Sequence, residues 1–206
     1  MKKNIVLSLT VAALVSMSLT ADAAFDYKAA AKAGLQAGVG TKQTTSTSTA
    51  NAQLVNSYKS QINAIVARGN NLSKTFNSSV NGASALLLSK QQLAKARGNA
   101  AVNSAEAAAK LAEYMVGAQA QSVSSNVKKL SAAQKSQLAK YVADMRTSMV
   151  GYTSVVKDAT ALTAKVSKTP SVAVALSPEL KKLKQVNSNA ASQAKLAGAL
   201  ISTWTK

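Results

Sequence analysis

The sequence predicts an all-α protein: an antiparallel helical bundle or elongated coiled coil of about four long helices, with a flexible N-terminal arm. Three observations support this fold class. Large apolar residues recur every three or four positions through most of the chain, which is the spacing of a helix face. No proline occurs between residues 50 and 169. Alanine, the best helix former, supplies 41 of the 206 residues.

Residues 1–23 have the form of a secretory signal peptide. Lys2 and Lys3 make a short positive region, residues 5–19 are mostly apolar, and Ala21-Asp22-Ala23 is a cleavage site of the small-x-small type. The alternative is a retained membrane anchor, but the apolar stretch is shorter than the ~20 residues that cross a bilayer. We therefore expect cleavage near Ala23 and a periplasmic or secreted protein with no transmembrane span after processing.

Large apolar side chains are scarce after the signal peptide. The 47% of hydrophobic residues includes the alanines, and only about a fifth of the mature chain is Leu, Ile, Val or Phe. Helices rich in alanine offset this shortage because they approach one another closely. Residues 24–50, rich in Ala, Gly, Thr and Ser, are predicted to be a flexible arm and linker, and residues 51–206 an Ala-rich helical bundle domain.

The first two predicted helices are separated by a glycine. Apolar residues from Leu54 to Val80 predict a helix that ends near Asn81-Gly82, a pair that favours a left-handed stop. A second helical stretch is expected from about Ser84 to about Val123. Whether this stretch is one helix or two is left open, because Gly98 inside it costs about 1 kcal/mol relative to alanine without forbidding continuation.

The third predicted helix has the most regular pattern. Ser131 and Gln134 have the spacing of a capping box, and the helix is expected to end before Pro170. Between them, apolar residues follow a seven-residue repeat, which is typical of a helix packed along a neighbour. These residues are Leu138, Val142, Met145, Met149, Tyr152, Val156, Ala159 and Val166. We interpret this stripe as core rather than as a surface that binds client proteins.

The last part of the chain predicts a connector and a fourth helix. Residues 171–176 alternate in polarity and are expected to form a short extended connector. Ser177 is the expected cap of the next helix, with Pro178 and Glu179 in its first turn. Its buried stripe is predicted to contain Leu183, Val186, Ala190, Ala197, Leu200 and Trp204. We expect Trp204 to close the end of the bundle; the alternative is an exposed anchor for a sugar or a membrane.

Composition argues against an enzyme. The chain has no Cys and no His, so it has no disulfide, thiol nucleophile, imidazole base or metal site built from these ligands. Asp144 and Asp158 are about 21 Å apart along one helix, and Glu106 and Glu113 about 10.5 Å, too far to work as an acid–base pair by themselves. We predict no catalytic residue, no cofactor and no metal.

Charge is the main indication of function. The 25 Lys and Arg residues outnumber the 7 Asp and Glu residues, for a formal net charge of +18. Such an imbalance opposes compactness by self-repulsion and attracts polyanions. The candidate contact residues are Lys128, Lys129, Lys181, Lys182 and Lys184. The alternative for each group of lysines, Lys128-Lys129 and Lys181-Lys182-Lys184, is an ordinary solvated helix surface without a binding role. Because only three of the cations are arginines, sequence-specific reading of nucleic acid is not expected.

The sequence therefore predicts an exported, non-catalytic interaction protein that binds an anionic envelope component or an acidic protein by electrostatics. Extracellular DNA, bound without sequence specificity, is a further candidate partner. The alternative is a periplasmic holdase-type chaperone for acidic or unfolded outer-membrane proteins, an analogy of charge, size and helicity without a shared motif. A membrane-active helical protein ranks third. The pattern leaves open whether the chain forms a homo-oligomer.

Overall fold

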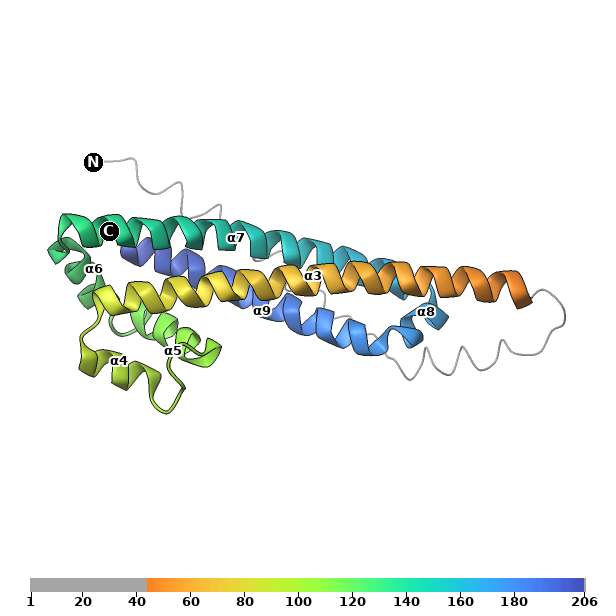
Figure 1. Cartoon of the computed structure of the whole chain (residues 1–206), viewed down its shortest axis with the longest axis horizontal. Coiled ribbons are helices and arrows are strands. Elements are labelled where there is room, and N and C mark those ends of the chain that lie inside the picture. Colours follow the sequence, from red (N-terminus) through yellow and green to blue (C-terminus); the bar gives the residue numbers. More distant parts are fainter. Residues whose placement is uncertain (1–43, 206) are drawn as a thin grey trace.

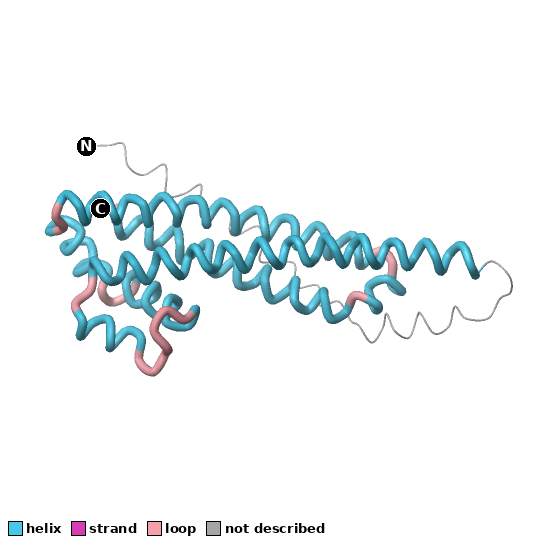
Figure 2. The backbone as a smooth tube through the Cα atoms, viewed as in Figure 1, coloured by secondary structure: helices cyan, strands magenta, loops and turns pink. Residues whose placement is uncertain are grey.

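The computed structural model describes residues 44–205, and every regular element within this range is an α-helix (Figure 2). The predicted all-α class is confirmed. The predicted signal peptide and residues 24–43 of the predicted arm lie outside the described residues. Residues 44–50, which were expected to belong to the linker, are instead the first residues of a long helix.

Three long helices lie side by side and form the body of the molecule (Figure 1). They are α3 (Thr44–Leu87), α7 (Ala132–Ser167) and α9 (Ser177–Trp204). α7 runs antiparallel to both α3 and α9 (Figure 1). The described part of the chain thus contains three long helices rather than about four, and the bundle is elongated because α3 alone is about 66 Å long at 1.5 Å per residue.

Three short helices pack at the end of the bundle where α3 ends (Figure 1). They are α4 (Lys90–Arg97), α5 (Ala105–Val116) and α6 (Ala120–Lys129). α5 packs against α3 and α9, whereas α4 packs mainly against α5. The expected helical stretch from Ser84 to Val123 is therefore neither one helix nor two, because its first residues belong to α3 and the rest is divided among three elements.

Side-chain caps and one glycine explain these breaks. The Ser89 hydroxyl accepts a hydrogen bond from the Gln92 amide at 3.2 Å, and the Gln92 side chain accepts one from the Ser89 amide at 2.9 Å. This capping box starts α4. Gly98 follows α4 and has a φ of +55°, which glycine adopts more readily than other residues because it has no Cβ atom. This change of backbone direction ends α4. Ser104 caps α5 through the Ala107 amide at 3.0 Å.

The prediction that α3 ends near Asn81-Gly82 is wrong, because the helix continues to Leu87. Gly82 has a packing role instead of a terminating one. A Cβ atom built at this position would lie 2.3 Å from Cζ of Tyr141, so the absence of a side chain lets the Tyr141 ring of α7 lie against α3. The glycine is explained by close approach between helices rather than by a left-handed turn.

The predicted start and end of α7 are confirmed. Ser131 and Gln134 form the expected capping box, and the helix ends at Ser167, before Pro170. Most of the predicted stripe is buried, but Met149 and Val156 are only half-buried. The buried positions of α7 are Leu138, Val142, Met145, Ser148, Tyr152, Val155, Ala159, Leu162 and Val166. The core face of α7 thus follows the seven-residue repeat and includes one buried serine, Ser148.

The predicted extended connector is helical. α8 (Pro170–Ala175) begins with Pro170, whose fixed φ suits the first turn of a helix, and buries Val172 and Ala173. The expected cap of α9 is also wrong: Leu176 occupies the N-cap position, and no side chain there accepts a hydrogen bond from a first-turn amide.

The far end of α9 confirms the predicted role of Trp204. The residue is 2% exposed and belongs to the same core as the three long helices. Near it, the Ser124 hydroxyl of α6 donates to the Thr203 carbonyl at 3.2 Å. Alanine contributes to the core as composition predicted: within residues 44–205 eight alanines are buried, namely Ala83, Ala107, Ala108, Ala112, Ala159, Ala173, Ala190 and Ala197.

Candidate polyanion-binding surface

Positive charge dominates the surface of the described residues. Residues 44–205 contain 19 lysines and arginines but only five acids, Glu106, Glu113, Asp144, Asp158 and Glu179. Three of these acids form ion pairs: Glu106 with Lys110, Asp158 with Arg68 and Glu179 with Lys59. The other 16 cations have no described carboxylate within the 4.0 Å that defines an ion pair. Most of the positive charge is therefore uncompensated.

The lysines predicted on α9 are exposed but do not form one group. Leu183 is buried between them, as predicted. On a helix of about 3.6 residues per turn, Lys181 and Lys184 are about 60° apart and lie on one flank of Leu183. Lys182 lies on the opposite flank, on the face of Glu179. The structure therefore brings Lys181 and Lys184 together and separates Lys182 from them.

Glu179 connects the start of α9 to α3. Its carboxylate lies 3.3 Å from Nζ of Lys59, an inter-helix pair, instead of pairing only along its own helix. A hydrogen bond to the backbone amide of Glu179 lowers the pKa of this carboxyl, and Lys59 and Lys182 lower it further against the opposing effect of burial. The carboxylate stays charged near neutral pH and compensates Lys59, but Lys181 and Lys184 form no ion pair with any acid in residues 44–205.

Two further lysines add to this end of the molecule. Lys165 is in the last turn of α7 and Lys168 is its C-cap residue, where cations interact favourably with the helix dipole. Both are exposed, and the six-residue α8 joins this helix end to the start of α9 (Figure 1). All five lysines lie at this end of the bundle, although Lys182 is on the opposite flank of α9 from Lys181 and Lys184. We call Lys165, Lys168, Lys181, Lys182 and Lys184 the α8-end cluster. Sequence reasoning missed the first two because they are isolated in the chain.

Lys128 and Lys129 are exposed at the opposite end of the bundle. Their helix, α6, contacts the last turn of α9 through Ser124. From Lys184 to Thr203 α9 rises roughly 28 Å, which exceeds the Debye length of about 8 Å at physiological salt. The two predicted lysine groups are therefore separate cationic surfaces.

Lys129 borders an open hollow at this end of the molecule. The hollow has a volume of about 320 Å³ and is lined by residues from the ends of α3 and α6 and the start of α7. Asn126 donates to the Leu87 carbonyl at 2.9 Å and so satisfies a backbone group at the end of α3. Lys129 can attract anions to this open hollow, which Ser89 also lines and in which no carboxylate occurs.

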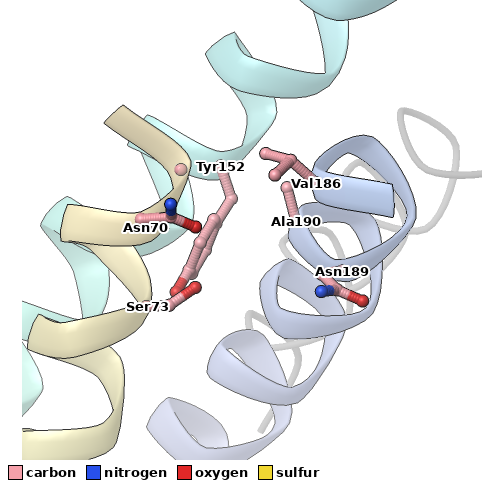
Figure 3. Close-up of a pocket in the computed structure, with 7 residues that line it drawn as sticks. Asn70, Ser73, Tyr152, Val186, Asn189 and Ala190 are labelled. Carbon is pink, nitrogen blue, oxygen red and sulfur yellow. The ribbon is translucent and has the colours of Figure 1, made fainter. Parts of the chain in front are cut away.

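A second, small and partly open pocket lies between the three long helices. Its volume of about 20 Å³ admits a water molecule and nothing larger. Figure 3 shows the Tyr152 ring between α3 and α9 with its hydroxyl beside Ser73. Burial raises the pKa of Tyr152 to about 12, and the Ser73 hydroxyl offsets part of this rise. Ser73 donates its own proton to Gln193 at 2.8 Å. This pocket is a feature of core packing.

The part of the chain from residue 44 to residue 205 contains no group of three or more Asp or Glu residues placed to hold a metal ion. Within the same range, no helix has a stretch long and apolar enough to cross a bilayer. Comparison with protein-family models, with curated proteins and with solved structures found no match. The geometry of the chain itself is thus the basis for a functional proposal.

Proposed function

We propose that this chain is an exported, non-catalytic helical interaction protein whose lysine-rich surface binds an anionic envelope or extracellular partner by electrostatics. The observation that carries this proposal is the surplus of cations: 19 against five acids in residues 44–205, with three ion pairs. A solvated surface needs charge for solubility but no such imbalance, and like charges destabilise the folded state by repulsion. An anionic partner relieves this repulsion.

The α8-end cluster is the surface that fits this role best. Its five lysines are exposed, and Glu179, the acid in the first turn of α9, forms its ion pair with Lys59. Lysine is a flexible point charge that lacks the planar fork with which arginine reads paired oxygens. We therefore propose recognition of charge density, as found on anionic polymers and acidic proteins, without selection for one geometry.

A holdase chaperone needs an apolar surface that accepts unfolded clients. The exposed large apolar residues of the described range are Leu54, Val102, Val150 and Val174, and each lies on a different element. No observation on the described residues favours this alternative, so it stays a prediction of the sequence.

Binding to a matrix that carries heparin, a model polyanion, tests the proposal. The triple variant Lys181→Gln, Lys182→Gln, Lys184→Gln removes three charges from the α8-end cluster and no core contact. We expect its affinity at low salt to fall at least about tenfold, because each lysine near an anionic surface contributes on the order of 1 kcal/mol.

The matched control removes three exposed lysines that lie on three different helices and outside the cluster: Lys74→Gln, Lys140→Gln and Lys195→Gln. Both variants have the same net charge. Circular dichroism and thermal unfolding establish that each is folded. Equal losses in the two variants would show that net charge alone, and not the α8-end cluster, determines binding.

A further inference from the structure

We propose that α4 and the following loop, residues 98–104, form a docking surface for an anionic lipid bilayer. This inference goes beyond the α8-end cluster, because it concerns a different part of the molecule and an apolar contact as well as charge. We call residues 90–104 the α4 tip. In Figures 1 and 2 its loop is the segment that projects farthest from the side of the three long helices.

The α4 tip is entirely cationic. Its charged residues are Lys90, Lys95 and Arg97, and no acid occurs between Ser89 and Ser104. Lys90 and Lys95 are exposed and Arg97 is half-buried. The nearest acid in the chain, Glu106, is compensated by Lys110 at 2.8 Å. An anionic surface that approaches the α4 tip therefore meets no uncompensated carboxylate there.

The loop exposes an apolar side chain. Val102 is 66% exposed, and the neighbouring Ala101 is exposed as well. Positive φ angles at Gly98 (+55°) and Asn103 (+64°) bend the chain on both sides of this pair. The backbone thus holds an apolar residue away from the core in which valine is usually buried. The exposed valine and its flanking cations together suit a partner that offers both an apolar medium and negative charge.

An anionic bilayer offers both. Lipid phosphates attract Lys90 and Lys95, and the interfacial region accepts a small apolar side chain below the headgroups. DNA, acidic polysaccharides and acidic protein surfaces supply the negative charge but no comparable apolar layer for Val102. The charge and the exposed valine together therefore favour lipid over these polyanions.

The attachment of the α4 tip suits docking without unfolding. No residue of α4 is buried, and the helix packs mainly against α5 through the half-buried Leu93 and Ala96. Its outward face carries Gln91, Ala94 and Lys95, at the three- and four-residue spacing of one helix side. Contact with a flat surface through this face and the loop leaves the core of the three long helices unchanged.

Vesicle flotation with the mature protein, which begins after Ala23, tests the inference. The vesicles contain either phosphatidylcholine alone or phosphatidylcholine with phosphatidylglycerol. We expect binding to the mixed vesicles and little to the neutral ones. Val102→Asp should weaken binding to the mixed vesicles at least about fivefold, because it replaces the inserted apolar group by a charge.

Val150→Asp is the matched control, since Val150 is 68% exposed on α7 and the substitution changes charge and chemistry identically. This variant should bind within about twofold of the unchanged protein. A second pair of variants tests the cations: Lys90→Gln with Lys95→Gln should weaken vesicle binding more than Lys74→Gln with Lys195→Gln.

The heparin measurement separates this inference from the proposed function. Val102→Asp should leave most heparin binding intact, whereas the Lys181, Lys182 and Lys184 variant should lose it. If Val102→Asp and Val150→Asp bind the mixed vesicles equally, the α4 tip is not the docking surface. The inference is also overturned if the protein binds heparin or DNA but neither kind of vesicle. A different result would contradict the proposed function and leave this inference standing: every variant keeps its heparin binding, and Val102→Asp alone loses vesicle binding.

Discussion

Tyr152 links burial to a measurable pH dependence. Its side chain is fully buried, and its ring meets Phe76 edge-on, with centroids 6.3 Å apart. The pKa of about 12 lies above the ordinary value of 10.0. The protonated hydroxyl therefore stabilises the fold fully below pH 10, and this contribution is lost as the pH rises from about 10 towards 12.

We expect Tyr152→Phe to remove this component of alkaline destabilisation. Denaturant unfolding of both proteins at pH 8 and at pH values approaching 12 measures it. The free energy of unfolding of the unchanged protein should fall by up to about 2 kcal/mol more than that of the variant over this interval. Parallel pH curves for the two proteins would show that Tyr152 ionises as it does in the unfolded chain.

Gly69 shows how small residues set helix spacing. It is buried within α3, and a Cβ built there would lie 2.5 Å from Cγ1 of Val186 on α9. Because valine is stiff at χ1, it cannot swing away as a long side chain would. We expect Gly69→Ala to lower the free energy of unfolding by about 1–3 kcal/mol, despite the higher helix propensity of alanine.

A double variant and a second glycine control this prediction. In the background of Gly69→Ala, Val186→Ala removes the clashing methyl groups and should be much less destabilising than Val186→Ala alone. Gly198 on α9 has only an ordinary contact, 3.7 Å from Sδ of Met149 to a built Cβ, so Gly198→Ala should raise stability by up to about 1 kcal/mol. Destabilisation of equal size at both glycines would refute the argument from close approach.

At the scale of elements, local signals were sufficient where a helix has its own cap and a regular core stripe. α7 meets both conditions, so its start at Ser131 and its end before Pro170 were predictable. The same type of signal, Ser89 followed by Gln92, precedes α4. It was overlooked because the apolar stretch around Leu86 to Leu88 suggested a helix that continues.

Elements whose own sequence carries only a weak helix signal could not be predicted without the structure. α4 contributes no buried residue, so it has no core stripe to recognise in the sequence. Residues 171–176 alternate in polarity, yet residues 171–175 are helical, because Pro170 suits the first turn and Val172 packs against the bundle. Contacts between elements, such as Lys59 with Glu179, depend on helix register, which no local pattern specifies.

Capping gives a test at the element scale. Ser131→Ala removes the hydroxyl that accepts from the Gln134 amide and should destabilise the protein by about 1 kcal/mol. Ser177→Ala is the matched control, because Ser177 lies inside α9 and caps nothing. Thermal unfolding of both variants measures the difference. An equal loss at Ser177 would mean that it does cap α9, as the sequence suggested.

At the scale of the whole molecule, the sequence predicted that the surface charge is positive but not how the charged residues are distributed over the surface. Exposure of Lys181, Lys182 and Lys184 followed from the buried Leu183 between them. The separation of Lys182 from the other two required the register of α9. The distance between Lys184 and Lys129 required the order of the helices along the bundle. Charge was therefore predictable from composition, and its division into surfaces was not.

Repulsion among these cations also predicts how an anionic partner is bound. A polyanion that replaces its counterions with lysines gains affinity from their release, and the gain shrinks as salt rises. Because the two ends of the bundle are farther apart than the Debye length, each end should contribute separately to this dependence.

The most direct test of the electrostatic proposal is the affinity for a short DNA duplex of arbitrary sequence as a function of salt concentration. We expect the logarithm of the association constant to fall linearly with the logarithm of salt concentration, by about 0.9 for each phosphate neutralised. The Lys181, Lys182 and Lys184 variant should have a shallower slope, by about 2 to 3. An affinity that is unchanged from low to high salt would contradict the electrostatic function.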